Sequence, residues 1–253
     1  MQVAVLTGAS SGIGAALARE LTRRGWLCVL LARREDRLGA LADELGCEYE
    51  VCDVADRANV EEVAARVLAG HPRLKLLVNN AGVPARASFT DGDPERIEQV
   101  VRTNYLGSVW CLRAFLPGLE AARPADVVNV VSVAGTVAFP PSGPYSASKH
   151  AQLAFSRATS AGLRSRGIRV HTVNPGFVET EGFPQRNALT SAFFRRAVLD
   201  PEDVARHVAD RVGEAPRETT IPRWYRWPGV LQAIAPNLVA RLIARRGGMY
   251  RRA

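Results

Sequence analysis

The chain has 253 residues, of which 47% are hydrophobic and 23% are charged, and its formal net charge is +8. This length allows one large core or two small ones. No stretch reaches the roughly 18 to 20 apolar residues that a membrane-spanning helix needs, and the four cysteines lack the spacing of a zinc site or a disulfide framework. The charge is concentrated in residues 216–253, which contain eight arginines and one acid, and the nearly neutral remainder argues against a basic groove for nucleic acid.

Short apolar runs alternate with longer amphipathic segments along the chain. We predict strands at residues 3–6, 27–31, 48–51, 74–78, 126–131 and 168–173, with a short one near 219–221. Helices are predicted at approximately 12–24, 35–45, 56–69, 93–119, 145–165 and 201–212. This order predicts an α/β fold: a single doubly wound Rossmann-type domain with a seven-stranded, mostly parallel sheet. Ligands of such sheets bind beyond the carboxyl ends of the strands.

A glycine-rich turn, Thr7 to Gly14, follows the first predicted strand and opens the first predicted helix. Glycines let the backbone approach a ligand closely, and a helix start offers free N–H groups and a positive dipole end to a pyrophosphate. The turn therefore predicts a dinucleotide site. Its contributing residues are Gly8, Ser10, Ser11, Gly12, Ile13 and Gly14.

The end of the second predicted strand bears on which dinucleotide binds. A site that selects NAD usually has an acid here, about 20 residues past the glycines. This chain has Ala32 in that place, followed by Arg33 and Arg34. A guanidinium can pair with a ribose 2′-phosphate in a bidentate manner, so we predict NADP(H) over NAD(H), with Arg33 as the first contact and Arg34 as the second. The alternative is that both arginines simply begin a solvated helix.

Tyr145 and Lys149 are four residues apart on a predicted helix and so project from the same face. A tyrosine normally keeps its proton up to a pKa of about 10. A nearby positive charge lowers that pKa toward working pH, which a proton-transferring tyrosine needs. Ser132 follows the apolar run 127–131, where its hydroxyl can share a bound oxygen with Tyr145. Alone, this spacing also arises by chance between surface neighbours.

Together these motifs resemble the short-chain dehydrogenase/reductase family. The shared features are the Gly-x-x-x-Gly-x-Gly turn, the run Asn79-Asn80-Ala81-Gly82, Asn104, Ser132, and Tyr145 with Lys149, all in order within about residues 1–215. The resemblance implies that Tyr145 is the general acid in carbonyl reduction and the base in the reverse reaction. It implies that Lys149 lowers the pKa of Tyr145 and bonds the nicotinamide ribose. Ser132 would hold the substrate oxygen, and Asn104 would position a water in a proton relay.

The resemblance also implies further cofactor contacts. Asn80, Ala81 and Gly82 would lie against the adenosine ribose, whereas Asn79 ties strands together. Asp53 would accept a hydrogen bond from the adenine amino group, and Val54 beside it would also contact the cofactor. A segment after the sixth strand would close over the nicotinamide carboxamide with Pro175, Gly176, Val178 and Thr180. Thr180 could equally cap the segment that follows it.

An apolar substrate region accompanies these motifs. Its members are Val133, Thr136, Val137, Phe139, Pro140, Phe177, Phe183, Phe193 and Phe194, and residues 179–199 are predicted to form a flap over it. We expect an NADP(H)-dependent enzyme, without a metal, that interconverts a hydrophobic ketone or aldehyde and an alcohol. The alternatives are a 3-oxoacyl-thioester reductase on the same scaffold and a cofactor-binding protein without turnover.

Residues 216–253 are predicted to form a basic, aromatic C-terminal extension of the domain formed by residues 1–215. Residues 222–228 place three aromatics and two arginines between prolines, and Pro236 opens a predicted helix with a stripe of Leu238, Val239, Leu242 and Ile243. Two functions compete: a lid or homo-oligomer interface, and contact with an anionic membrane surface. We expect the chain to begin directly in the fold, because no charged leader precedes the first strand. We also expect a cytoplasmic enzyme that forms a homodimer or homotetramer.

Overall fold

The computed structural model describes residues 2–85, 88–90, 92–138, 142–185 and 196–245. Seven strands form one sheet: β1 (Gln2–Thr7), β2 (Trp26–Ala32), β3 (Glu48–Val51), β4 (Leu76–Asn79), β5 (Ala125–Val130), β6 (Ile168–Pro175) and β7 (Glu218–Ile221). Their order is β3-β2-β1-β4-β5-β6-β7, and all neighbours pair in parallel. The predicted fold class is confirmed.

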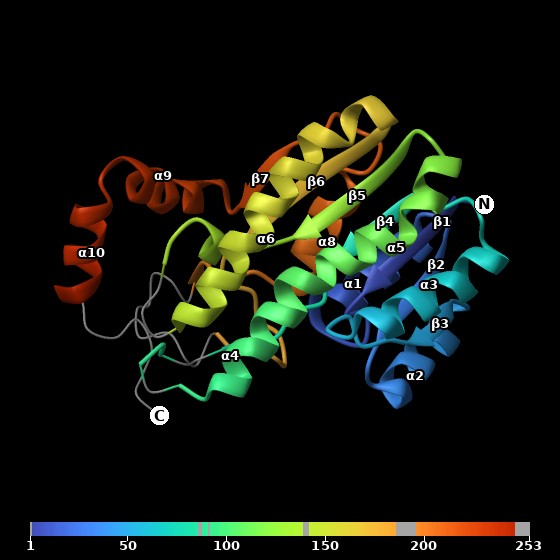
Figure 1. Ribbon diagram of the computed structural model, residues 1–253, viewed down its shortest axis with the longest axis horizontal. Coiled ribbons are helices and arrows are strands. Elements are labelled where there is room, and N and C mark those ends of the chain that lie inside the picture. Colours follow the sequence, from blue (N-terminus) through green and yellow to red (C-terminus); the bar gives the residue numbers. More distant parts are fainter. Residues whose placement is uncertain (1, 86–87, 91, 139–141, 186–195, 246–253) are drawn as a thin grey trace.

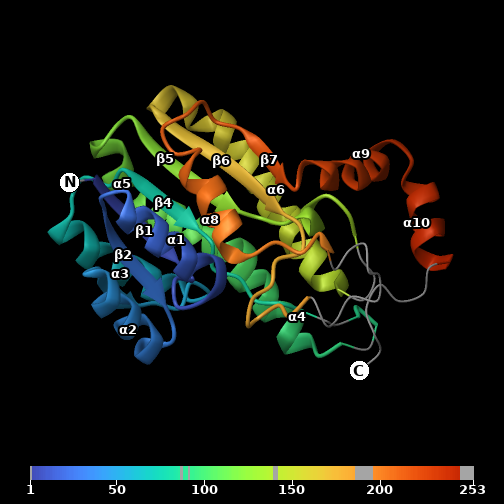
Figure 2. The ribbon, with the colours of Figure 1, turned by 180° about the vertical axis from the view of Figure 1, so that it is seen from behind.

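Helices cover both faces of this sheet (Figures 1 and 2). They are α1 (Gly12–Arg23), α2 (Glu35–Leu45), α3 (Arg57–Gly70), α4 (Pro94–Val101), α5 (Gly107–Ala121), α6 (Gly143–Gly162) and α8 (Pro201–Ala209). Alternate residues of β1 serve two cores: Ala4 and Leu6 pack with α1, α2 and α8, while Val3 and Val5 pack with α3 and α5. Burial on both faces explains why β1, β2 and β4 are almost continuously apolar, whereas the edge strands β3 and β7 are more exposed and polar.

The segment predicted as one helix over 93–119 is interrupted by a π-helical turn, Arg102–Leu106. Asn104 lies in this turn and is fully buried. Gly107, directly after it, allows close packing, because a Cβ atom there would lie 2.8 Å from Val54 Cγ2. Such turns are frequent at functional sites but leave little trace in a 3.6-residue period.

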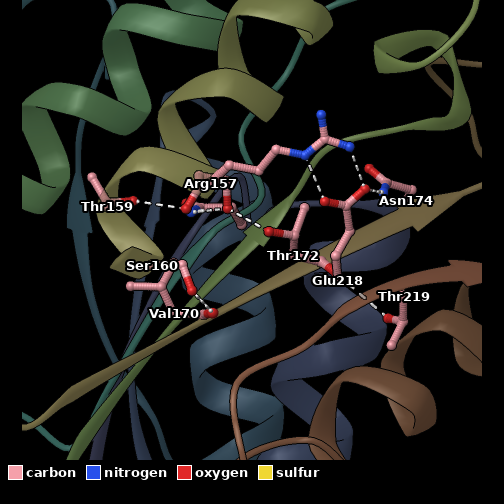
Figure 3. Close-up of polar contacts among 10 residues, drawn as sticks. Arg157, Thr159, Ser160, Val170, Thr172, Asn174, Glu218 and Thr219 are labelled. Carbon is pink, nitrogen blue, oxygen red and sulfur yellow. Dashed lines mark hydrogen bonds and ion pairs between the residues drawn. The ribbon is translucent and has the colours of Figure 1, made fainter. Parts of the chain in front are cut away.

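Glu218, the first residue of β7, joins α6 to the edge of the sheet (Figure 3). Arg157 of α6 donates two hydrogen bonds to its carboxylate, at 2.7 and 2.9 Å, and Asn174 of β6 donates a third at 3.3 Å. The sheet therefore includes residues that follow the boundary drawn at residue 215. The division into a domain and an extension stays a prediction.

Beyond β7 the chain forms a short 3-10 turn (Arg223–Tyr225) and two helices, α9 (Arg226–Ile234) and α10 (Pro236–Arg245). Both helices extend away from the sheet (Figures 1 and 2). The helix predicted to begin at Pro236 is present, whereas α9 was not anticipated. In the described part of the chain, no helix combines the length and apolar character that crossing a membrane requires.

Candidate active site

A cavity of about 740 Å³ lies at the carboxyl ends of the strands. It lies where the strand order reverses between β1 and β4, the usual ligand position in this architecture. Almost all the site residues predicted from the sequence line it: Gly8, Ser10, Ser11, Gly12, Ile13, Arg33, Arg34, Asp53, Val54, Asn80, Ala81, Gly82, Ser132, Tyr145, Lys149, Pro175, Gly176, Val178 and Thr180. Gly14 and Asn104 do not line it, but each packs against a lining residue, Gly14 against Gly8 and Asn104 against Gly82.

The glycine turn is shaped by contacts that exclude larger residues. Gly8 has a φ of +67°, and a Cβ atom on Gly14 would lie 2.2 Å from the Gly8 carbonyl oxygen. Asn80 fastens the turn by donating from Nδ2 to the carbonyl oxygens of Thr7 and Gly8, at 3.1 and 3.3 Å. Ser11 is the N-cap of α1 but makes no side-chain capping bond. The first N–H groups of α1 are therefore suited to an anionic ligand.

Guanidinium groups stand beside this turn, at the end of β2. Arg34 donates to Ser11 Oγ at 2.6 Å and to Ser10 Oγ at 3.2 Å. Half-exposed Arg33 lies 4.0 Å from the Asp53 carboxylate. Glu181, from the loop after β6, pairs with Arg34 at 3.5 Å. The cavity thus has a cationic region next to the glycine turn, although carboxylates partly neutralise it.

Ser132 and Tyr145 line the cavity farther along the same edge of the sheet. Ser132 directly follows Val131, and its Oγ accepts a hydrogen bond from the Ala134 N–H at 3.1 Å. As an acceptor in that bond, its hydroxyl keeps the hydrogen for donation to a substrate oxygen. Tyr145 lies in the first turn of α6, and its ring packs 5.5 Å from that of Phe183.

Lys149 is buried one turn beyond Tyr145, and its Nζ lies 5.9 Å from the centre of the tyrosine ring. The ammonium donates to the Val130 carbonyl oxygen at 3.2 Å and to Gln152 Oε1 at 2.7 Å. Burial disfavours the charged form and lowers the pKa of Lys149 to about 7. The lysine can therefore gain or lose a proton near neutral pH.

Gln152 is a site residue that the sequence reasoning missed. It is fully buried, and its Nε2 donates to Ser108 Oγ at 2.9 Å, while Ser108 donates in turn to the Asn104 carbonyl oxygen at 3.4 Å. A hydrogen-bonded chain thus connects Lys149 to the π-helical turn. The available signal was the spacing, since Gln152 follows Lys149 by three residues and shares its helix face.

Asn104 holds two neighbouring segments together. Its Nδ2 donates to the Val83 carbonyl oxygen at 3.1 Å and to Ser148 Oγ at 3.0 Å, and its Oδ1 accepts from the Val83 N–H at 2.8 Å. The side chain therefore fixes the loop after β4 against α6. Its role in positioning a water stays a prediction. Asn79 joins β4 to β5 by donating to Asn129 at 2.9 Å, as expected.

The loop after β6 closes one side of the cavity. Thr180 Oγ1 accepts from the Phe183 N–H at 3.1 Å, so it organises the loop as well as lining the cavity. Of the predicted substrate region, Val133, Phe177 and Phe183 line the cavity. Val137 is buried, Thr136 packs against α9, and Phe139, Pro140, Phe193 and Phe194 lie outside the described residues. The same holds for residues 186–195 of the predicted flap.

Comparison with known sequences decides the family. The sequence profile described as short chain dehydrogenase matches residues 2–189. The chain belongs to the short-chain dehydrogenase family. It is therefore an oxidoreductase of that family, as the motifs predicted.

Curated relatives resemble most or nearly all of the chain. Dehydrogenase/reductase SDR family member 7B of Bos taurus is 30% identical over 270 residues, covering 99% of this chain and 82% of the relative. An uncharacterized oxidoreductase of Staphylococcus haemolyticus is 35% identical over 207 residues, covering 81% and 87%.

Solved structures of the family share the fold. An alcohol dehydrogenase from the archaeon Thermococcus sibiricus, complexed with 5-hydroxy-NADP, superimposes with a TM-score of 0.77 at 29% identity, covering 87% of this chain and 96% of that one. An actinorhodin polyketide ketoreductase with NADPH gives a TM-score of 0.79 at 28% identity, covering 87% and 95%.

Proposed function

We propose that this chain is an NADP(H)-dependent oxidoreductase that interconverts a hydrophobic ketone or aldehyde and the corresponding alcohol. The observation that carries the proposal is a single cavity lined both by the acid–base group of Ser132, Tyr145 and Lys149 and by Arg33 and Arg34. These residues follow different strands of the sheet, so an extended dinucleotide along that edge would contact both groups.

The cofactor preference rests on charge next to the glycine turn. Arg33 and Arg34 directly follow Ala32, the position at which an NAD-selective site usually has a carboxylate, and a 2′-phosphate would pair with their guanidinium groups. The similar structures are complexes with 5-hydroxy-NADP, NADP and NADPH. Gly8 to Gly14 and the uncapped start of α1 suit the pyrophosphate.

The chemistry follows from where charge develops. The nicotinamide, when bound, supplies a hydride to a carbonyl carbon or accepts one from an alcohol. During reduction, negative charge grows on the carbonyl oxygen, where the hydroxyls of Ser132 and Tyr145 stabilise it by hydrogen bonding. Tyr145 then transfers its proton to that oxygen. The Lys149 ammonium stabilises the resulting phenolate, and in the oxidation direction the phenolate takes the proton back.

The substrate class rests on the apolar part of the lining. Val133, Phe177 and Phe183 offer no charged partner near Ser132 and Tyr145, so they favour a hydrophobic carbonyl compound over a polar one.

A direct test is NADPH oxidation by the purified protein over a panel of aromatic, alicyclic and long-chain carbonyl compounds, with NADH in parallel. We expect turnover with NADPH that Tyr145→Phe abolishes, while fluorescence titration still detects NADPH binding to the variant. Undiminished turnover by Tyr145→Phe would overturn the mechanism. Equal rates with NADPH and NADH would overturn the cofactor preference.

A further inference from the structure

The last described part of the chain forms a C-terminal arm, residues 223–245, whose base adjoins the active site. Tyr225 is buried, and its ring packs against Gly176 and lies 5.8 Å from the ring of Phe177. Farther along, Gly229 of α9 lies so close to Thr136 that a Cβ atom there would come within 2.7 Å of it. The arm is therefore seated on the two loops that follow β5 and β6, beside the cavity.

The arm exposes a row of large apolar side chains. Trp227, Val230 and Ile234 recur at a helical spacing along α9, with 59%, 44% and 75% of their surfaces exposed. Leu238 and Leu242, one turn apart on α10, are exposed as well. Single exposed hydrophobic residues are ordinary, but a series of them on two consecutive helices is typical of an interaction surface.

Every charge along the arm has the same sign. From Thr219 to Ala253 the sequence contains seven arginines and no aspartate, glutamate, lysine or histidine. Arg223, Arg226 and Arg241 are exposed, and the Arg226 guanidinium lies over the Trp227 ring, 4.9 Å from its centre. Apolar side chains and cations are thus interleaved without internal ion pairs.

We propose that the C-terminal arm docks the enzyme on an anionic lipid surface. Tryptophan and aliphatic side chains enter the boundary between headgroups and acyl chains, and arginines pair with the anionic headgroups. The charge pattern disfavours a second copy as the occupant, because a two-fold contact would set arginines against arginines with no acid between them. Docking would bring the membrane next to the loops that border the cavity, where a lipophilic carbonyl compound can enter.

The test is co-sedimentation of the full-length protein with phosphatidylcholine vesicles, with and without phosphatidylglycerol, at low and high salt. We expect binding only to the anionic vesicles, weakened by salt. Trp227→Ser/Ile234→Ser and Arg223→Gln/Arg241→Gln should each lower the bound fraction at least about tenfold. Tyr49→Ser, an exposed aromatic on β3, and Arg113→Gln/Arg164→Gln, which removes the same charge elsewhere, should bind like the wild type.

Circular dichroism and light scattering complete the design, since they show that the variants fold and report their oligomeric state. No binding of the wild type to anionic vesicles at low salt would overturn the proposal, as would equal binding by the arm variants and their controls. Conversion of an oligomer to a monomer by the arm variants, without loss of vesicle binding, would assign the surface to a second copy instead. None of these readouts depends on turnover.

Discussion

At the scale of single residues, we expect the environment of Lys149 to set the pH range of the proposed reaction. Its pKa is lowered to about 7 by burial, so the ammonium loses its proton as the pH rises through neutrality. In the proposed mechanism, reduction needs that charge to stabilise the Tyr145 phenolate. We therefore expect kcat/KM for carbonyl reduction to fall as the pH rises above about 7, and a pH–rate profile of the purified enzyme checks this.

Gln152 gives this pH dependence a sharper test. Its Oε1 accepts from the Lys149 ammonium and so favours the charged form. Gln152→Leu should move the falling limb of the profile to lower pH, and Gln152→Glu, which adds a negative charge, should move it to higher pH. NADPH binding should change little. Ser156→Ala, at a buried polar position of α6 bonded to Asn129, is the control, and a limb that is identical in all variants would contradict a positioning role.

Arg33 and Arg34 give the residue-scale test of cofactor choice. Replacing both by alanine removes two charged partners of a 2′-phosphate, and we expect the KM for NADPH to rise about 10- to 100-fold. The KM for NADH should stay within about twofold, because NADH has no 2′-phosphate. Steady-state kinetics with both cofactors measure the difference. A similar loss with NADH would show that these side chains act on the turn rather than on the phosphate.

Site residues with a distinctive chemistry were predicted from the sequence, whereas an ordinary polar residue was missed. Tyr145, Lys149 and Ser132 were predicted because they occur in order with the glycine turn and Asn104, although the spacing of Tyr145 and Lys149 alone also arises by chance. Gln152 was missed because a glutamine on a helix is most often solvated, and only the packing of α5 against α6 reveals that it is enclosed.

At the scale of elements, the close packing of Gly14 against Gly8 requires a residue without a side chain at position 14 of the glycine turn. A Cβ atom on Gly14 would lie 2.2 Å from the Gly8 carbonyl oxygen, so Gly14→Ala must displace the turn or α1. We expect loss of NADPH binding and a stability decrease of about 1 to 3 kcal/mol. Gly70→Ala, at the end of α3 with no atom within 4 Å of the added group, is the matched control. Thermal unfolding and cofactor titration measure both, and unaltered binding by Gly14→Ala would contradict the steric account.

The strands were predicted to within about two residues at each end. For β1, β2 and β4 the reason is burial on both faces of the sheet, which gives continuous apolar runs, whereas the edge strands β3 and β7 are more exposed and polar. The π-helical turn within the helix predicted over 93–119 was missed, because one extra residue per turn barely changes the spacing of the apolar residues. Helix α9 was missed because its exposed face is itself apolar, so the segment lacks the polar side that marks an ordinary surface helix.

At the scale of the whole molecule, the topology assembles the site. Residues after β1, β2, β4, β5 and β6 meet at one edge because those strands are parallel neighbours in the sheet. Strand–helix alternation predicted that edge, and the order of the motifs predicted which residues would reach it. The direction in which the C-terminal arm leaves the sheet could not be read from the sequence, because it depends on Tyr225 and Gly229 packing against loops more than 40 residues earlier in the chain.

The central claim is hydride transfer from a nicotinamide to a carbonyl carbon with Tyr145 as the proton donor. Its most direct test is reduction of a hydrophobic ketone with NADPH deuterated at the transferable position of the nicotinamide, followed by mass spectrometry of the alcohol. We predict that the wild-type enzyme places deuterium on the carbinol carbon and that Tyr145→Phe, although it binds NADPH, forms no labelled alcohol. Labelled alcohol in equal yield from both proteins, or product without deuterium, would contradict the account.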